Sequence, residues 1–158
     1  AASRGVTAMG VEISARQTVV VLALSKSSQP FRLHTDVGSQ FSGFVSATGR
    51  LIAAYGAEGW PQLRKQFNAT HWDKAPTFET WKKEVEQTRE RHWAVDRDNF
   101  VSGLTVVAVP ILDSAHQLRY TLVAAGLSSQ LNAAAVNELA STMKDEAQAV
   151  AAMLYSRG

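Results

Sequence analysis

The sequence predicts an α+β domain in which helices flank an antiparallel β-sheet. Two pairs of strand-like segments are each joined by a short polar turn, which is typical of β-hairpins. Helical segments stand between and after these pairs, without the regular strand-helix-strand alternation of a parallel sheet. The chain has 158 residues, of which 46% are hydrophobic, enough for one core without disulfides or metal. We therefore expect a single domain over residues 1–158.

The first predicted hairpin lies in the N-terminal third of the chain. Residues 18–24 are mostly β-branched and apolar at successive positions, which favours a strand covered on both sides. Residues 25–30 are polar and end in a proline, which predicts a turn. Residues 31–35 then alternate apolar and polar side chains, so we expect a half-exposed strand returning antiparallel to the first.

A second hairpin is predicted from residues 104–112 and 119–125, which are apolar and separated by a polar turn. Pro110 has no N–H group to donate to a neighbouring strand. It therefore belongs at an edge of the sheet or near the end of its strand.

Two short helices are predicted between the hairpins. Residues 46–55 form the first, with Ser46 as a candidate N-cap and Gly56 as its C-terminal stop. Residues 59–67 form the second, because Pro61 is well suited to a first helical turn.

Two longer helices are predicted from apolar residues that recur at spacings of three and four. The first covers residues 78 to about 91 and ends at His92, which tolerates the left-handed conformation of a helix C-cap. The last begins after Asn132, a good N-cap. Its apolar stripe comprises Val136, Leu139, Ala140, Met143, Ala147, Val150, Ala151 and Leu154.

Composition excludes several functions. The net charge is only +2, and basic residues alternate with acidic ones, so we expect no direct nucleic-acid binding by this chain. There is no cysteine, which excludes disulfides and thiolate chemistry and fits a cytoplasmic location. The longest apolar run, residues 19–24, is far below the roughly 20 residues of a membrane span. Residues 1–5 contain neither an initiator methionine nor the charged and apolar regions of a signal peptide, so we expect a cut point there.

Catalytic and metal sites are also not predicted. The histidines have no partner three or four residues away, as a helical ligand pair would require; they are His34, His71, His92 and His116. No nucleophile elbow and no glycine-rich phosphate loop are present. The sequence therefore predicts no catalytic residue, no metal and no cofactor.

The start of the helix at residue 46 is the strongest candidate for ligand binding. The backbone amides of Ala47 and Thr48, aligned with the helix dipole, can hold a carboxylate or carbonyl. An ordinary capped helix explains the same residues, and both interpretations stay open. Asp96 follows a helix in a polar segment that ordinarily faces water. Trp81 is expected in the core, whereas Trp72 and Trp93 suit a pocket or an interface.

Three stretches, residues 44–51, 85–96 and 102–113, together resemble the effector-binding domain of the IclR family of bacterial transcriptional regulators. The first is similar to the family's small-residue turn into a helix. The second is similar to its helix end with arginine, an aromatic residue and aspartate. The third is similar to its Gly-x-x-x-x-Ala-x-Pro-x-x-Asp strand. The match begins at about Ala15, and His92 replaces the family's usual glycine.

The resemblance implies a GAF/profilin-like fold and a small-molecule effector, expected to be an organic acid. It also implies assembly into homodimers or homotetramers. Family members bind DNA through an N-terminal winged helix-turn-helix, which the first dozen residues of this chain are too few to form. We expect that this module was removed or is naturally absent.

Position by position, the resemblance implies an effector pocket of Phe41, Ala47, Thr48, Asp96, Leu104, Val106, Val123 and Ala125. Asp96 would accept a hydrogen bond from the ligand. Members that bind small oxoacids carry polar side chains where this chain has Val106, Val123 and Ala125. Branched hydrocarbon favours apolar ligand surface. We therefore expect an effector larger and less polar than glyoxylate or pyruvate, such as an aromatic carboxylic acid.

Two other functions remain open at this point. A structural oligomerisation domain with a filled pocket would bind no metabolite. An enzyme would use Asp96 as its acid or base. Thermal stabilisation by a ligand without turnover would favour the sensor over both.

Overall fold

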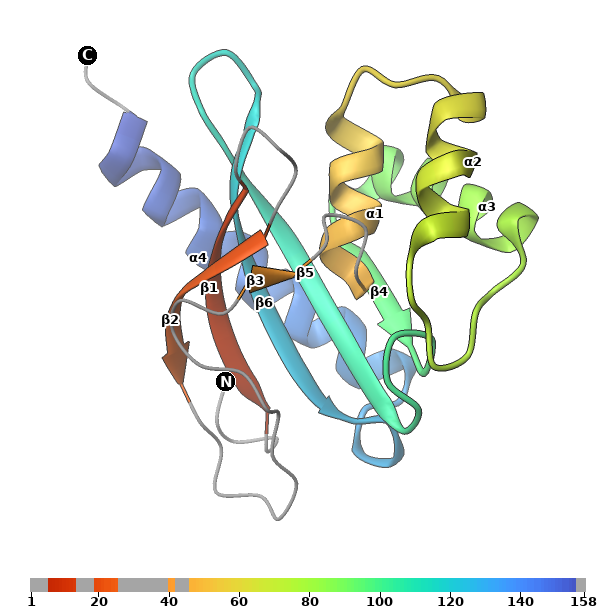
Figure 1. Ribbon diagram of the computed structural model, residues 1–158. Coiled ribbons are helices and arrows are strands. Elements are labelled where there is room, and N and C mark those ends of the chain that lie inside the picture. The colour runs from red at the N-terminus through yellow and green to blue at the C-terminus, as the bar shows by residue number, and fades with distance from the viewer. Residues whose placement is uncertain (1–5, 14–18, 26–39, 42–45, 156–158) are drawn as a thin grey trace.

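The computed structural model describes residues 6–13, 19–25, 40–41 and 46–155 (Figure 1). Six strands form one sheet in the order β3-β2-β1-β6-β5-β4, and every neighbouring pair is antiparallel. The strands are β1 (Thr7–Ile13), β2 (Val19–Ser25), β3 (Gln40–Phe41), β4 (Ala94–Arg97), β5 (Leu104–Leu112) and β6 (Leu118–Leu127). The helices are α1 (Ser46–Tyr55), α2 (Trp60–Ala69), α3 (Phe78–Arg91), the 3-10 turn η2 (Ser128–Gln130) and α4 (Ala133–Tyr155). The predicted α+β class is confirmed.

Helices cover both faces of the sheet. In β5, Val106 and Ala108 pack into a core with α1, α2 and α3, while Val107 and Val109 pack into a second core with α4. In Figure 1, α4 lies behind the sheet and the other three helices lie together on the opposite side. A strand buried on both faces needs apolar residues at successive positions, which is why β5 reads as an unbroken hydrophobic run.

The helix α3 agrees closely with the sequence prediction. It begins after Thr77, whose Oγ1 accepts a hydrogen bond from the Thr80 amide at 3.1 Å. It ends at His92, which has a φ of 68° and donates its amide N–H to the Thr88 carbonyl at 2.8 Å. The left-handed C-cap expected at this histidine is therefore confirmed.

An aromatic cluster joins α2 to α3. Phe67 of α2 has its ring centroid 5.5 Å from Phe78 and 5.3 Å from Trp81. Trp60 meets Phe78 edge to face at 6.3 Å. Trp81 is fully buried, as expected. These contacts attach α2 to the domain by ring packing, which each pair strengthens beyond its buried area.

The helix α4 packs its apolar stripe on the second face of the sheet. Asn132 caps it as predicted, because its Oδ1 accepts a hydrogen bond from the Ala135 amide at 2.9 Å. Val136, Leu139 and Met143 are buried. The predicted stripe is wrong at its end, since Leu154 is 49% exposed. Figure 1 shows the reason: the last turns of α4 run past the sheet.

Three described strands were not predicted as such: β1, β4 and the two-residue β3. β1 lies in the middle of the sheet between β2 and β6, and β4 forms the edge beside β5. The predicted strand at residues 18–24 is confirmed as β2, which also includes Ser25 of the predicted turn at 25–30. The rest of that turn and the predicted strand at 31–35 lie outside the described residues. β5 and β6 pair as the predicted hairpin.

The short length of β4 leaves part of β5 without a neighbour on one side. Pairing between them ends at Ala94 and Ala108. The Leu104 carbonyl accepts from the Asp98 amide at 2.9 Å on this side, so the even-numbered residues of β5 direct their backbone groups to this edge. Pro110 therefore turns its nitrogen, which has no hydrogen, toward the uncovered edge. The predicted placement of Pro110 near a strand end is confirmed.

Candidate functional site

The first turn of α1 is buried against the sheet. Ser46, Ala47 and Thr48 are each at most 7% exposed, and α1 contacts β4, β5 and β6. An α-helix leaves its first N–H groups without an intrahelical acceptor. The amides of Ala47 and Thr48 are in this position, so the turn offers hydrogen-bond donors inside the domain.

Ser46 does not cap the helix with its side chain, contrary to the prediction. Its Oγ is buried and makes no hydrogen bond with the described part of the chain. Its backbone φ is 55°, in the left-handed region that non-glycine residues seldom adopt. A buried hydroxyl without a partner costs about 1–3 kcal/mol. The start of α1 therefore carries both an unusual backbone and a buried hydroxyl that has no hydrogen bond to the described residues.

The apolar pocket residues inferred from the sequence lie together on the sheet face below α1. Val106 pairs with Ala125 across β5 and β6, and Ala108 pairs with Val123 one step along. Leu104, Val106, Val123 and Ala125 belong to one buried cluster with Ala47. Residues far apart in the sequence thus meet on one surface.

A second buried hydroxyl faces the same side of the sheet. Thr121 precedes Val123 by two residues in β6, and side chains two apart in a strand share a face. It is fully buried, and its Oγ1 makes no hydrogen bond with the described residues.

Phe41 is placed differently from the other predicted residues. It lies in β3 and pairs with Val19 of β2. β3 lies at the edge of the sheet opposite to β4, and β2 and β1 separate it from β6. The orientation of its side chain lies outside the described residues.

Arg50 organises the polar side of the site, although the sequence analysis did not single it out. Its guanidinium is fully buried and uses all five N–H donors. Nε and Nη2 donate to Glu84 Oε1 at 3.0 and 2.9 Å, and Nη2 also donates to Asn99 Oδ1 at 2.9 Å. Nη1 donates to Asp96 Oδ2 at 3.0 Å and to the Ser46 carbonyl at 3.1 Å. Arg50 therefore joins α1, α3 and β4.

Asp96 is held within this network. It lies in β4 and is fully buried, so the expectation that its polar segment faces water is wrong for this residue. Its Oδ2 accepts from Arg50, and its Oδ1 accepts from the amides of Asn99 and Phe100 at 3.0 and 3.2 Å. Asp96 thus ties the loop after β4 to α1.

Trp72 closes one side of the network. The Arg50 guanidinium carbon lies 5.8 Å from the centre of its ring, within range of a cation–π contact. Its ring also packs on Phe67, with centroids 5.6 Å apart. Trp72 was expected in a pocket or an interface, and in the structure its ring packs against Arg50 and Phe67. Trp93 packs against the core on the α4 side and lines a groove beside α4, in agreement with the pocket expectation.

A sequence signal for Arg50 does exist. It is the only charged residue of a ten-residue helix whose other side chains are small or apolar. A helix with this composition is buried along most of its circumference, and a buried arginine requires acidic or carbonyl partners. The partners themselves come from α3 and β4, which sequence spacing alone does not connect.

Within the described residues, no three His, Asp or Glu side chains gather as a metal site would require. The helices of the same described residues include none that is long and apolar enough to cross a membrane.

Residues 5–152 match the family model described as bacterial transcriptional regulator IclR C-terminal. The chain belongs to this family. The match includes β1, which the resemblance noted from the sequence, beginning at about Ala15, did not cover. A comparison with curated protein sequences found no match.

Solved structures of IclR-type regulators share the fold. The chain superposes on the IclR transcriptional regulator from Alicyclobacillus acidocaldarius with a TM-score of 0.79 at 22% identity, covering 96% of this chain and 62% of the other. The IclR of Thermotoga maritima gives a TM-score of 0.79 at 19% identity, with 96% and 62% covered. The repressor BlcR of Agobacterium tumefaciens gives 0.79 at 18% identity, with 96% and 61% covered. The chain thus spans about three fifths of these proteins.

Proposed function

We propose that this chain is the small-molecule effector-binding domain of an IclR-type regulator that acts in the cytoplasm as a homodimer or homotetramer. The effector is a moderately apolar organic acid, such as an aromatic carboxylic acid. It binds without being turned over and alters DNA binding by an attached helix-turn-helix domain. One observation carries the proposal: the polar first turn of α1 is buried beside an apolar patch of the sheet.

The polar end of the ligand is assigned to the start of α1. The amides of Ala47 and Thr48 and the positive end of the helix dipole favour a carboxylate. The Ser46 hydroxyl supplies a further donor, because it has no partner among the described residues. Buried hydroxyls are ordinarily paired, so a ligand oxygen at this position would remove the cost of leaving Ser46 unsatisfied.

The apolar end of the ligand is assigned to the strands. Leu104, Val106, Val123 and Ala125 present only hydrocarbon, and their cluster contains Ala47 at the start of α1. Such a surface favours a ring or branched chain over a two- or three-carbon oxoacid. Phe41 completes the proposed set of pocket residues.

Asp96 enters the proposal as a positioning residue. Three internal hydrogen bonds already occupy its carboxylate. Through Arg50 it is connected to the Ser46 carbonyl, at the point where α1 begins. We propose that Asp96 supports ligand binding by fixing this turn.

A calorimetric titration tests the proposal. Benzoate is expected to bind more tightly than glyoxylate or pyruvate, and to raise the melting temperature of the chain. Preferential binding of glyoxylate would reject the apolar assignment. A chain that no carboxylic acid stabilises, but whose melting temperature rises with its own concentration, would indicate a structural oligomerisation domain instead.

Two neighbouring valines provide a matched control. Val106→Thr places a hydroxyl on the α1 side of β5, and Val107→Thr places the same group on the α4 side. Both are buried, so each substitution should destabilise the chain by about 1–3 kcal/mol. Only Val106→Thr is expected to change benzoate affinity. Equal effects of the two variants on affinity would contradict the proposed position of the ligand.

A further inference from the structure

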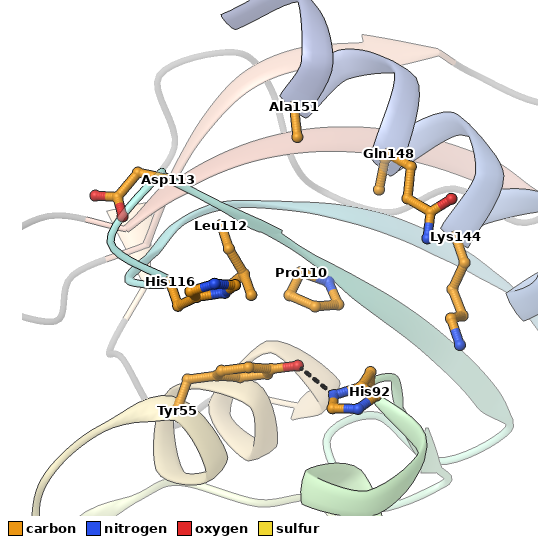
Figure 2. Close-up of a pocket in the computed structure, with 10 residues that line it drawn as sticks. Tyr55, His92, Pro110, Leu112, Asp113, His116, Lys144, Gln148 and Ala151 are labelled. Carbon is orange, nitrogen blue, oxygen red and sulfur yellow. Dashed lines mark hydrogen bonds between the residues drawn. The ribbon is translucent and has the colours of Figure 1, made fainter. Parts of the chain in front are cut away.

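A groove of about 350 Å³ opens on a part of the molecule remote from the first turn of α1 (Figure 2). It lies next to the first residue of β4, Ala94, beyond which the Pro110 edge of β5 is left uncovered. The C-terminal end of α1 and the His92 cap of α3 form one wall, and α4 forms the other. Its volume is within the range of about 300–1,000 Å³ typical of small-molecule sites.

The floor of this groove is apolar. Figure 2 shows Pro110 and Leu112 between the two walls, with Ala151 above them on α4. Pro110 directs its carbonyl, but no N–H, to the uncovered strand edge. This edge is therefore poorly suited to pairing with another β-strand, which would need donors as well as acceptors.

The wall formed by α1 and α3 always retains a hydrogen-bond donor. The Tyr55 hydroxyl lies 2.9 Å from His92 Nδ1. If the tyrosine donates, neutral His92 carries its proton on Nε2; if the histidine donates, the tyrosine O–H is free. Burial raises the pKa of Tyr55, so the phenol stays protonated at neutral pH. Either arrangement leaves one N–H or O–H available to a ligand acceptor.

Lys144 is the one lysine or arginine among the groove residues. Lys144 Nζ donates to the Arg91 carbonyl at 3.2 Å and makes no ion pair with the described residues. Asp113 is the one acid among the groove residues, and the Gln117 amide above all holds its pKa below the usual range. Its charge is balanced by Arg119 at 3.3 Å. Asp145 lines the neighbouring groove on the other side of Lys144.

We propose that this groove is a second ligand site, for a small monocarboxylate whose apolar body lies over Pro110, Leu112 and Ala151. The carboxylate faces Lys144 and the donor retained by the Tyr55–His92 pair. His116, at the rim, supplies an additional imidazole. One permanent positive charge favours a monoanion over a phosphate, and the apolar floor favours a ligand with hydrocarbon surface. This site does not depend on the proposed effector site at α1.

Alanine-methyl NMR resolves the two sites on the same chain. Ala147 and Ala151 line the groove, whereas Ala47 and Ala125 report on the α1 side. Benzoate is expected to shift the Ala147 and Ala151 methyl resonances in a saturable way, and its neutral isostere benzamide to shift them at several-fold higher concentration. Shifts of Ala47 and Ala125 test the effector site separately, so either site can fail without the other.

Substitutions in the groove sharpen the test. Lys144→Gln keeps a donor but removes the charge, and should weaken benzoate binding at Ala151 about threefold. Ala151→Phe should abolish benzoate binding by filling the groove, and the Ala147 methyl reports this because the variant lacks the Ala151 methyl. The matched controls are Lys83→Gln on α3 and Ala149→Phe on α4, both at exposed positions. Neither control should change the titration.

Four results would overturn the proposal. The first is that Ala147 and Ala151 stay unshifted by benzoate at tens of millimolar. The second is that benzamide binds as well as benzoate, and the third is that both controls act like the groove variants. Shifts of the same two methyls on simple concentration of the protein, without ligand, would place a second copy of the chain over the groove and would also contradict it. Circular dichroism of each variant confirms that it is folded.

Discussion

The two faces of the sheet are buried by different chemistry. Against α4, the core consists of apolar side chains such as Val107, Val109 and Met143. Against α1 and α3, a similar apolar cluster surrounds a fully buried ion pair, Arg50 with Asp96. The first face is stabilised by the apolar area that folding removes from water. The second face also contains two buried charges. Their desolvation costs free energy, and a packed core does not need them. The polar side is therefore where we place function.

The largest expected effect comes from breaking the ion pair. Arg50→Met leaves Asp96 buried without its cation and should lower the free energy of unfolding by about 3–5 kcal/mol. Urea denaturation measures this loss. The double variant Arg50→Met, Asp96→Leu removes both charges and should be more stable than Arg50→Met alone. If the free energy of unfolding of Arg50→Met were within about 1 kcal/mol of the parent value, the pair would not be buried as described.

On the apolar face, Met143→Ala should cost about 2–4 kcal/mol by leaving a cavity between α4 and the sheet. Met143 is 5% exposed. Because no charge is involved, the loss measured by urea denaturation should be the same in low and high salt. If the loss of stability varied with salt, charge would contribute to this face as well, and the contrast between the two faces would be contradicted.

A smaller effect is expected where α4 begins. Asn132→Ala removes the side-chain acceptor of the Ala135 amide and should cost about 1 kcal/mol, measured as a lower melting temperature. Asn132→Asp keeps an acceptor and serves as the control, with stability close to the parent. Equal losses in both variants would argue against capping as the cause.

The smallest effect is expected at Ser46, where the sign of the change in unfolding free energy is informative. Ser46→Ala removes a buried hydroxyl that has no partner in the described structure, so the free chain should be unchanged or more stable by up to about 1 kcal/mol. The same variant should bind carboxylic acids less tightly, as measured by calorimetry. Clear destabilisation of the free chain would show that Ser46 is already satisfied there.

Local features of this fold were readable from the sequence. The ends of α3 could be predicted because the Thr77 cap and the His92 C-cap depend on neighbouring residues only. β1 could not, because Gly10 and Glu12 weaken its pattern and its pairing partners in β6 lie more than a hundred residues away. β4 was missed for a similar reason: four residues become a strand through pairing with β5.

The candidate site divides in the same way. The resemblance to the IclR family grouped Val106, Val123 and Ala125 with Ala47, and the structure places them in one cluster. The network around Arg50 was not foreseen. Its partners come from α3, β4 and the following loop, so only the tertiary fold brings them within hydrogen-bond distance.

The most direct test of a ligand site on the polar face is the amide NMR of Ala47 and Thr48 during titration with benzoate. Our account predicts that both amide protons move downfield and become protected from exchange, as expected when each donates to a carboxylate, while the Val107 amide is unaffected. Unchanged Ala47 and Thr48 resonances under conditions where calorimetry detects binding would contradict it.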